Sequence, residues 1–249
     1  MSTWFISDLH LFPTRPQSIE LLLQFLTYLE QQRPQGLYVL GDLFEYWVGD
    51  DVLEHPMGAG FVPVIEAFQR LAAQGVPIAF QHGNRDFLLG KHCAEQAGFT
   101  LLPEHYVVDL YGVPTLLMHG DSLCTEDRDY QRLRMQLRDP VWQQQFLALP
   151  LAQRIEQAQA LRAESHTQMQ AKAEAILDVT PTTVESVMQS HGVTQLIHGH
   201  THCPAIHPFI VQGQCYQRIV LGDWYGDKGS FLKVSYQTVK LLNDYQSAY

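Results

Sequence analysis

Side chains that can bind a metal ion follow five short apolar stretches of the sequence, each where a β-strand would end. They are four histidines, two aspartates and one asparagine: Asp8, His10, Asp42, Asn84, His119, His200 and His202. Each motif alone is weak evidence, because a Gly-Asp pair or a lone polar residue at a strand end often marks only a turn. Five motifs in the same position relative to a strand indicate one shared site.

The types of these seven side chains narrow the choice of metal. Imidazole and carboxylate groups without thiolates suit manganese, iron or zinc, and they disfavour soft-metal sites and all-oxygen calcium sites. Seven ligands are too many for one tetrahedral zinc ion. Two metal ions about 3.5–4 Å apart that share a bridging carboxylate would use all seven.

Arg85 stands directly after the asparagine, in the stretch HGNRDFLLG. A guanidinium group beside such a site can bind a phosphate through two parallel hydrogen bonds. The alternative is a surface ion pair between Arg85 and Asp86, which would contribute little and could lie anywhere. The residues alone leave both interpretations open.

The first 120 residues alternate between strand-like and helix-like segments. Short β-branched or aromatic runs that end in polar residues occupy residues 3–7, 37–41, 77–81 and 115–119. Apolar residues recur between them at helical spacing. This alternation predicts an α/β layered domain, in which ligands gather at the carboxyl ends of the strands. Three later runs, 194–199, 216–222 and 230–236, predict a second sheet packed on the first.

A stretch without glycine, from Asp121 to His191, interrupts this alternation. The prolines at 140, 150 and 181 divide it into helices expected near 127–138, 141–149, 151–178 and 182–191. We therefore predict a helical cap inserted at 126–178, and a core formed by residues 1–125 and 179–249.

The predicted insertion differs in charge from the rest of the chain. It carries seven basic and eight acidic residues, whereas the whole chain has 16 Lys and Arg against 26 Asp and Glu. One interpretation is a solvated helical hairpin. The other is a cap whose cations face an anionic ligand.

The overall composition excludes some classes of protein. A formal net charge of −10 argues against a general nucleic-acid surface, although bound metal ions could still attract an anionic substrate. The first residues, MSTWFISDLH, do not resemble a secretory signal. No run approaches the roughly 18 apolar residues that a spanning helix needs. The four cysteines lack metal-site spacing, so we expect reduced thiols.

The motifs D-x-H, G-D-x-x-E, G-N-R-D and G-H-x-H together resemble those of the calcineurin-like metallophosphoesterases. They stand within GDLFEYWVGDD, HGNRDFLLGK, HGDSLCTEDRDYQ and IHGHTHCPA. The resemblance implies an α/β fold with a double β-sheet sandwich flanked by helices. It also implies a centre with two Mn²⁺ ions. Asp8, His10, Asp42 and His202 would hold one ion, and Asp42, Asn84, His119 and His200 would hold the other.

The longer stretches resemble the branch of this family that acts on a lipid-linked, diacylated UDP sugar in bacterial lipid A synthesis. The implied reaction is attack of a metal-activated water on the α-phosphorus, which releases UMP and a sugar 1-phosphate. Many relatives carry a histidine where this chain has Arg85, and that histidine can protonate an alkoxide leaving group. An arginine effectively cannot act as the acid that protonates this leaving group. A phosphate leaving group needs no such acid, so Arg85 fits a pyrophosphate bond.

The resemblance also assigns roles in catalysis and substrate binding. Asn84, Arg85 and His200 would act on the reacting phosphate, and Asp127, Ser165 and Lys172 would contact the substrate from the cap. Met169 stands where the family has an asparagine, which puts one polar contact in doubt because a thioether has no N–H donor. Among the other histidines, His198 is the best candidate to support a metal ligand.

Apolar residues of the insertion allow two interpretations. They are Trp142, Phe146, Leu147, Leu149, Leu151, Ile155 and Leu161. They could form the packing core of the insertion, since helices normally bury one apolar face, or they could line a groove for acyl chains.

The resulting hypothesis is a monomeric, cytoplasmic enzyme that contacts the inner membrane peripherally and binds no nucleic acid. One rival is a nucleic-acid phosphodiesterase of the same superfamily, which would be expected to show a broad basic surface. The other is a non-catalytic scaffold on the same fold, which would be expected to have broken metal motifs. All seven ligand positions are filled here.

Overall fold

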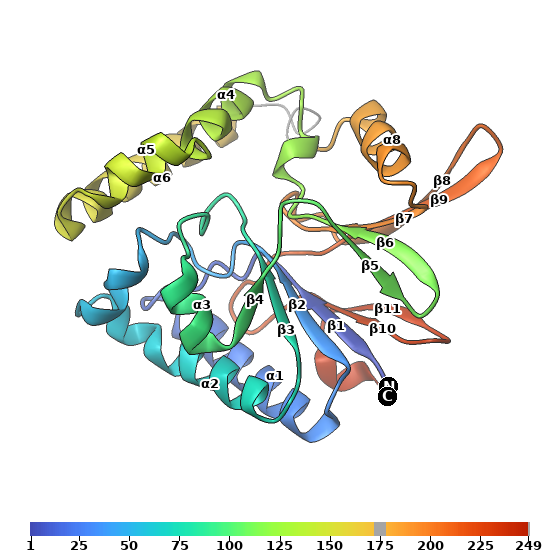
Figure 1. Cartoon of the computed structure of the whole chain (residues 1–249), viewed down its shortest axis with the longest axis horizontal. Helices are drawn as coiled ribbons and strands as arrows, with labels where there is room; N and C mark the ends of the chain where they lie inside the picture. Colours follow the sequence, from blue (N-terminus) through green and yellow to red (C-terminus); the bar gives the residue numbers. More distant parts are fainter. Residues whose placement is uncertain (172–177, 249) are drawn as a thin grey trace.

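Two β-sheets pack face to face in the computed structural model, which describes residues 1–171 and 178–248 (Figure 1). The first sheet has the strand order β11-β10-β1-β2-β3-β4. Its strands are β1 (Thr3–Ile6), β2 (Gly36–Leu40), β3 (Ile78–Gln81), β4 (Phe99–Leu101), β10 (Phe231–Val234) and β11 (Val239–Leu242). The second sheet has the order β5-β6-β7-β9-β8. Its strands are β5 (Tyr106–Leu110), β6 (Val113–Leu117), β7 (Gln195–His198), β8 (Ala205–Val211) and β9 (Gln214–Val220).

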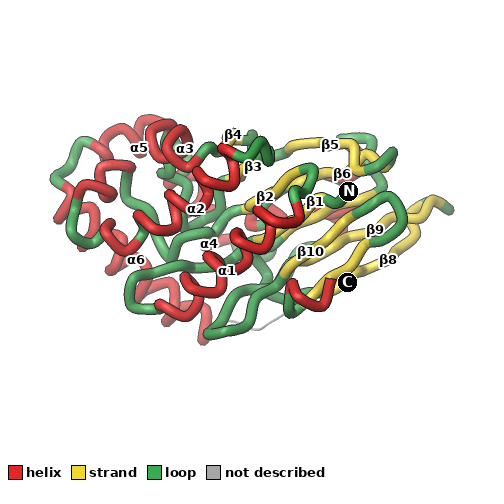
Figure 2. The backbone as a smooth tube through the Cα atoms, turned by 90° about the horizontal axis from the view of Figure 1, so that it is seen from below, coloured by secondary structure: helices red, strands yellow, loops and turns green. Residues whose placement is uncertain are grey.

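Helices cover the outer faces of both sheets. Against the first sheet lie α1 (Pro16–Gln32), α2 (Val62–Ala73) and α3 (Lys91–Ala97). Against the second lies α8 (Pro181–Ser190). Short 3₁₀ turns occupy Asp50–Glu54, Gly58–Gly60, Asp121–Leu123 and Tyr245–Ala248. This arrangement confirms the predicted α/β sandwich with flanking helices, and Figure 2 shows most of the helices gathered away from the second sheet.

The alternation of side chains along β1 places them in two of the three separate hydrophobic cores that the described residues form. In β1, Trp4 and Ile6 point toward α1, while Phe5 points toward the second sheet. Phe5 meets Ile197 and Ile219 of the second sheet in the layer between the sheets. A single strand therefore contributes to both cores, and it leads directly into the motif that contains Asp8.

Parallel pairing brings the motifs to one edge of the sandwich. Strands β1, β2 and β3 are parallel neighbours, and so are β6, β7 and β9. The carboxyl ends of parallel strands meet at the same edge of a sheet. The five motifs that follow β1, β2, β3, β6 and β7 consequently lie together.

The prediction of a second sheet made only of late strands was wrong in its membership. Strand β10 pairs with β1 in the first sheet, and β6 belongs to the second sheet although it precedes the insertion. Strands β4, β5, β8 and β11 were not predicted. All four lie at the edges of the sheets, where little apolar surface is buried, and β8 exposes every second residue.

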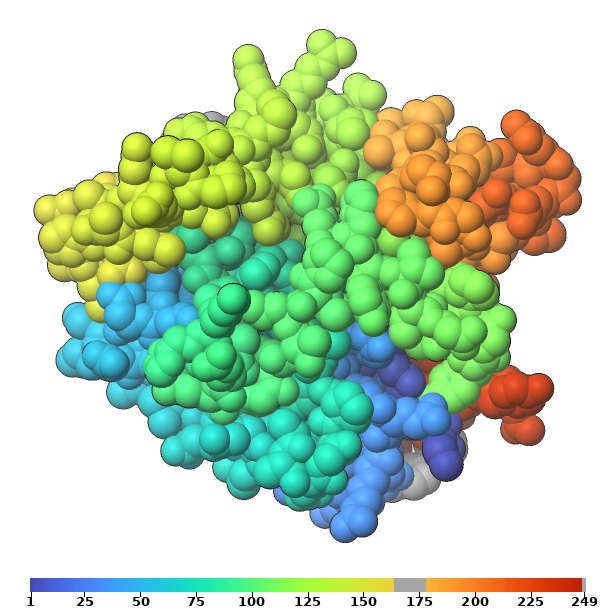
Figure 3. Space-filling model, in the orientation of Figure 1, coloured from blue at the N-terminus to red at the C-terminus, as the bar shows by residue number. Residues whose placement is uncertain are grey.

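Three helices follow β6 and form a layer of their own, here called the α4–α6 layer. They are α4 (Arg128–Leu137), α5 (Pro140–Leu147) and α6 (Leu151–Ala171). The prolines and the missing glycines predicted these helices, although the expected end of the third near residue 178 lies beyond the described part of the helix. Figure 3 shows the layer lying across the loops that follow β2 and β3.

Arginines fasten the α4–α6 layer to the rest of the protein. Arg154 is only 3% exposed, pairs with Asp51 through two nitrogens, and donates to the backbone carbonyls of Val48 and Leu149. Arg162 pairs with Glu45, whose side chain is 12% exposed. These cations therefore bind the acidic body of the protein, a use that neither interpretation of the charge pattern had considered.

Replacing Arg154 should destabilise the fold. Arg154→Ala leaves the carbonyl groups of Val48 and Leu149 without their donor, so we expect the free energy of unfolding in urea to fall by about 2 kcal/mol. The matched control is Arg132→Ala, because Arg132 is exposed and pairs with Asp129 on the same helix; it should change stability by less than about 0.5 kcal/mol. Equal effects would contradict an anchoring role for Arg154.

Candidate metal centre

The structure brings all seven predicted ligand residues into one continuous set of contacts. At one end, His202 Nε2 lies 3.3 Å from Asp8 Oδ1 and 3.2 Å from His10 Nε2. At the other end, Asn84 Oδ1 lies 3.0 Å from His119 Nε2 and 2.9 Å from His200 Nδ1.

Asp42 joins the two ends. Its carboxylate lies 3.9 Å from His10 Nδ1 and 3.7 Å from His119 Nε2.

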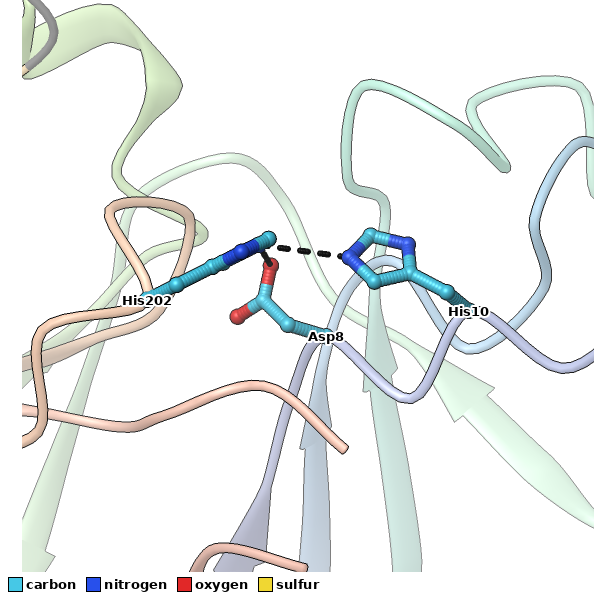
Figure 4. A group of neighbouring side chains, drawn as sticks. All are labelled: Asp8, His10 and His202. Atoms are coloured by element: carbon cyan, nitrogen blue, oxygen red, sulfur yellow. Dashed lines mark hydrogen bonds and ion pairs between the residues drawn. The ribbon is translucent and has the colours of Figure 1, made fainter. Parts of the chain in front are cut away.

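Two groups of three side chains have the spacing of a metal site. Asp8, His10 and His202 each present one ligand atom within 4.8 Å of the others, and so do Asp8, Asp42 and His119. Figure 4 shows His202 reaching from the loop after β7 toward Asp8 and His10, which come from the loop after β1. Asp8 belongs to both groups, so its carboxylate lies between them just as that of Asp42 does.

The backbone at these positions is unusual. Five of the seven residues have positive φ angles: 56° at Asp8, 48° at His10, 54° at Asp42, 68° at His200 and 56° at His202. Only eight non-glycine residues of the described chain do so, and this conformation costs free energy for residues with a side chain. Such strain concentrates at functional sites, where the surrounding structure holds it in place.

Buried carboxylates hold the loops against each other. Asp86 is fully buried and accepts hydrogen bonds from the backbone N–H groups of Leu43, at 2.7 Å, and Gly83, at 2.8 Å. Asp8 accepts from the backbone N–H of His200 at 2.9 Å. The loop after β3 is thereby tied to the loop after β2, and the loop after β7 to the loop after β1.

Burial sets the protonation of several of these groups. It lowers the pKa of His10 and of His200 to about 3, so both imidazoles are neutral at pH 7 and keep a lone pair for a metal ion. Burial also raises the pKa of Asp42 to about 7. A carboxylate buried without a cation is unfavourable, and a metal ion would stabilise its charged form.

The donor set fits a pair of divalent cations. Asp8 Oδ1 and His10 Nδ1 are buried without a hydrogen-bond partner among the described residues, which is costly unless something else binds them. His119 donates from Nδ1 to the backbone carbonyl of Leu40 at 2.8 Å and turns Nε2 toward the cluster. Metal-binding histidines are oriented in this way.

Arg85 does not form the surface ion pair considered as the alternative. Asp86 is buried, and its carboxylate accepts hydrogen bonds from backbone N–H groups. The Arg85 side chain is 13% exposed, and its Nε lies 3.7 Å from Asp42 Oδ2. Its backbone N–H donates to Asp42 Oδ1 at 2.9 Å. Arg85 therefore stands directly beside the candidate metal centre.

A pocket extends from Asn84 and Arg85 into the space under the α4–α6 layer. Its walls include one arginine from the loop after β3, Arg85, and three from the insertion, Arg134, Arg138 and Arg162. The apolar part of the lining consists of Tyr46, Trp47, Val48, Phe87, Leu88, Leu133, Leu137, Trp142, Phe146, Ala158 and Leu161.

The apolar residues of the insertion divide between the pocket and the main core of the protein, and their use as a groove for acyl chains stays a prediction. Trp142, Phe146 and Leu161 line the pocket. Leu149, Leu151 and Ile155 are partly buried against the main core. Leu147 is 41% exposed.

The four substrate contacts expected from the insertion fall in different places. Asp127 is buried and caps α4, where its side chain accepts from the backbone N–H of Tyr130 at 3.1 Å. Ser165 and Met169 lie within α6. Lys172 lies outside the described residues.

Two residues beside the centre were not predicted. Asp223 Oδ2 lies 3.6 Å from His202 Nδ1. Gly222-Asp223 follows β9 as Gly41-Asp42 follows β2, and this sixth motif could have been recognised in the sequence. The ring centroids of Tyr130 and His200 lie 5.8 Å apart, and no local sequence pattern predicts this neighbour.

His198 supports the neighbouring loop rather than a ligand side chain. Its ring is fully buried, donates from Nδ1 to the carbonyl of Gly199 at 2.8 Å, and accepts from Arg218 at 3.2 Å. Burial, together with the positive charge of Arg218, lowers the pKa of His198 to about 3.

His198 should make the metal-free protein sensitive to acid. Between pH 6.5 and about 3 the unfolded histidine binds a proton that the folded one does not, so stability is lost as the pH falls through this window. In urea unfolding between about pH 4 and 6, His198→Gln should reduce the slope of the unfolding free energy against pH by up to about 1.4 kcal/mol per unit. Parallel slopes for the two proteins would contradict this assignment.

Gly83 is required for the close approach of two loops. A Cβ on Gly83 would overlap Asp42 Oδ1 and its backbone nitrogen, so Gly83→Ala should displace Asp42. We expect binding of Mn²⁺, measured by equilibrium dialysis, to weaken about 100-fold. Gly75→Ala is the control, because Gly75 has a φ of +85° but nothing within 4 Å of a Cβ; it should bind Mn²⁺ normally. Normal binding by Gly83→Ala would show that the loops can separate without cost.

Comparison with known proteins agrees with this geometry. Residues 1–204 match the calcineurin-like phosphoesterase family. A UDP-2,3-diacylglucosamine hydrolase of Xanthomonas campestris pv. campestris is 50% identical over 243 residues, which cover 94% of this chain and 95% of that protein. Another, from Chromohalobacter salexigens, is 50% identical over 94% of this chain and 93% of that protein.

A solved structure supports the fold. The crystal structure of a dimetal phosphatase from Danio rerio has a TM-score of 0.52 and 16% sequence identity, and the match covers 97% of this chain and 95% of that one. The match to the calcineurin-like phosphoesterase family, over residues 1–204, includes all seven candidate ligand residues. The chain therefore belongs to the calcineurin-like phosphoesterase family.

Proposed function

We propose that this protein hydrolyses the pyrophosphate bond of UDP-2,3-diacylglucosamine and releases UMP and 2,3-diacylglucosamine 1-phosphate. Relatives of half-identical sequence over nearly the whole chain carry the name of this hydrolase. The observation that carries the proposal is the pocket, which begins at Asn84 and Arg85 beside the candidate metal centre and continues along apolar walls. A substrate with a pyrophosphate and two acyl chains needs both parts.

We assign two Mn²⁺ ions to the seven ligand residues. Asp8, His10, Asp42 and His202 would hold one ion, and Asp42, Asn84, His119 and His200 the other. Their imidazole and carboxylate groups suit manganese, and two buried atoms among them, Asp8 Oδ1 and His10 Nδ1, make no hydrogen bond within the described chain. When bound, such a pair of cations activates a water and neutralises phosphoryl charge.

Arg85 supplies fixed positive charge to the reacting phosphate in this proposal. A guanidinium group is a fixed cation that binds phosphoryl oxygens without donating a proton to the leaving group. The leaving group is itself a phosphate, so it departs as a stable anion. We assign Asn84 and His200, whose side chains meet at 2.9 Å, to the same phosphoryl site.

The α4–α6 layer acts as a cap over the substrate in this proposal, with the cap and core divided as the sequence predicts. The arginines of the pocket suit the anionic part of the substrate, and the aromatic and aliphatic walls suit the acyl chains. We assign Asp127, Ser165 and Lys172 to polar contacts with the substrate, and Met169 to the acyl chains.

We further propose peripheral contact with the cytoplasmic face of the inner membrane. No helix of the described chain meets the length and hydropathy that a membrane crossing demands. The α4–α6 layer exposes apolar side chains at Met135, 66% exposed, Val141, 60%, and Leu147, 41%. Such residues can enter the headgroup region while the protein remains on the surface. We expect the protein to act as a monomer.

Hydrolysis of UDP-2,3-diacylglucosamine by metal-stripped protein, with and without added Mn²⁺, tests the proposal. We expect UMP release to require Mn²⁺, and Arg85→Ala to lower kcat/KM about 100-fold to 1,000-fold because it removes charge stabilisation of the transition state. Arg132→Ala is the matched control, since Arg132 is exposed and away from the pocket lining, and it should retain activity.

A generic aryl phosphodiester separates the possible outcomes. Turnover of that compound without turnover of the lipid substrate would retain the metal centre and exclude the substrate assignment. Absence of Mn²⁺-dependent turnover of both would leave a non-catalytic scaffold on the same fold.

A further inference from the structure

We propose that helix α4 is a structural part of one of the two metal subsites. A row of side chains on α4 holds the loops that carry Asn84 and His119, so that the Mn²⁺ affinity of this subsite depends on α4 even before substrate binds. The proposal rests on the metal pair assigned above.

The row consists of Tyr130 and Arg134 of α4 and of Arg138, the residue that caps its C-terminal end, which are spaced four residues apart. Side chains at this spacing lie on one face of a helix. This face of α4 is turned toward the core, because all three side chains donate hydrogen bonds to groups of the core. The row therefore acts as one unit along the strand ends.

Its first two members hold the loop after β6. Asp121, which stands two residues after His119, is buried and accepts hydrogen bonds at Oδ2 from Tyr130 Oη at 2.8 Å and Arg134 Nε at 2.7 Å. Arg134 also pairs with Glu104 at 2.5 Å, so its planar guanidinium spans two carboxylates. A buried carboxylate needs such partners.

The third member holds the loop after β3. Arg138 donates through one terminal nitrogen to the carbonyl of Gly83 at 2.9 Å and to that of His82 at 3.3 Å. On the other side, the N–H of Gly83 binds Asp86. The peptide groups directly before Asn84 are thus held by hydrogen bonds to Asp86 of the core on one side and to Arg138 on the other.

The row acts on one subsite more than on the other. Asn84 and His119 stand on the two loops that it holds, and the Tyr130 ring lies against His200. Asp8 and His10 follow β1 instead, and the charged neighbours of His202 are Asp8 and Asp223. Loosening α4 should therefore weaken the subsite of Asn84, His119 and His200 selectively.

Titration of metal-stripped, full-length protein with Mn²⁺ in the absence of substrate tests this inference. The paramagnetic resonance signal of free Mn²⁺ reports binding without any need for activity. We expect Arg134→Gln and Arg138→Gln to weaken one of two binding steps about tenfold, as removal of groups that support metal ligands does, and to leave the other step unchanged.

Two kinds of variant separate a specific effect from a general one. Arg138→Lys should restore most of the affinity, because one nitrogen of Arg138 makes both contacts and an ammonium group can do the same. Arg132→Gln, on the exposed face of α4, and Arg154→Gln, which loosens the α4–α6 layer at α6, should leave both steps unchanged.

The outcomes distinguish this inference from the proposed function. Two normal steps in Arg134→Gln and Arg138→Gln would overturn the role of α4 and retain the metal pair. Equal weakening of both steps, or the same effect in Arg154→Gln, would also overturn it, because general loosening would then be the cause. If the unaltered protein bound no pair of Mn²⁺ ions, the metal centre of the proposed function and this inference would both fall.

Discussion

Everything at the candidate centre depends on placing several ionisable side chains, most of them buried, at one edge of a β-sandwich. Parallel strands in both sheets end at this edge, and their loops must approach more closely than ordinary turns do. The backbone meets this demand with positive φ angles at Asp8, His10, Asp42, His200 and His202, and with glycine at position 83. Buried carboxylates then tie the loops together through backbone N–H groups. The cluster is held together by the whole sandwich rather than by any one element, so the strain at each loop is tolerated.

The ligand residues could be predicted from the sequence because they repeat one local rule, a polar residue after a short apolar strand. The same rule would have found Asp223. It could not tell which sheet a strand joins, because this depends on long-range pairing: β6 pairs with β7, and β10 pairs with β1. Contacts between distant segments were equally hidden. Asp86 was considered only as an alternative, surface partner for Arg85, and it is in fact buried and accepts hydrogen bonds from the backbone of two loops.

The charge of the α4–α6 layer shows how a composition can be explained only by the structure. The insertion predicted at 126–178 is nearly neutral on an acidic protein, and four arginines of the layer bind carboxylates or carbonyl groups of the body: Arg134, Arg138, Arg154 and Arg162. Three of these also line the pocket. The same cations can therefore hold the layer in place and present positive potential to an anionic ligand. The interpretations offered by the sequence, a solvated hairpin or a ligand-facing cap, left out the first of these roles.

The α4–α6 layer lies in the connection between β6 and β7, two strands that are direct parallel neighbours. A crossover of this kind can lengthen at little entropic cost, because closure entropy grows only with the logarithm of its length, and the register of the sheet does not change. The layer is thus the part of the molecule that could be exchanged among proteins of this fold to change the ligand, while the strands stay as they are. Such an exchange would succeed only if the incoming segment also supplied partners for the carboxylate of Asp121 and the carbonyl of Gly83.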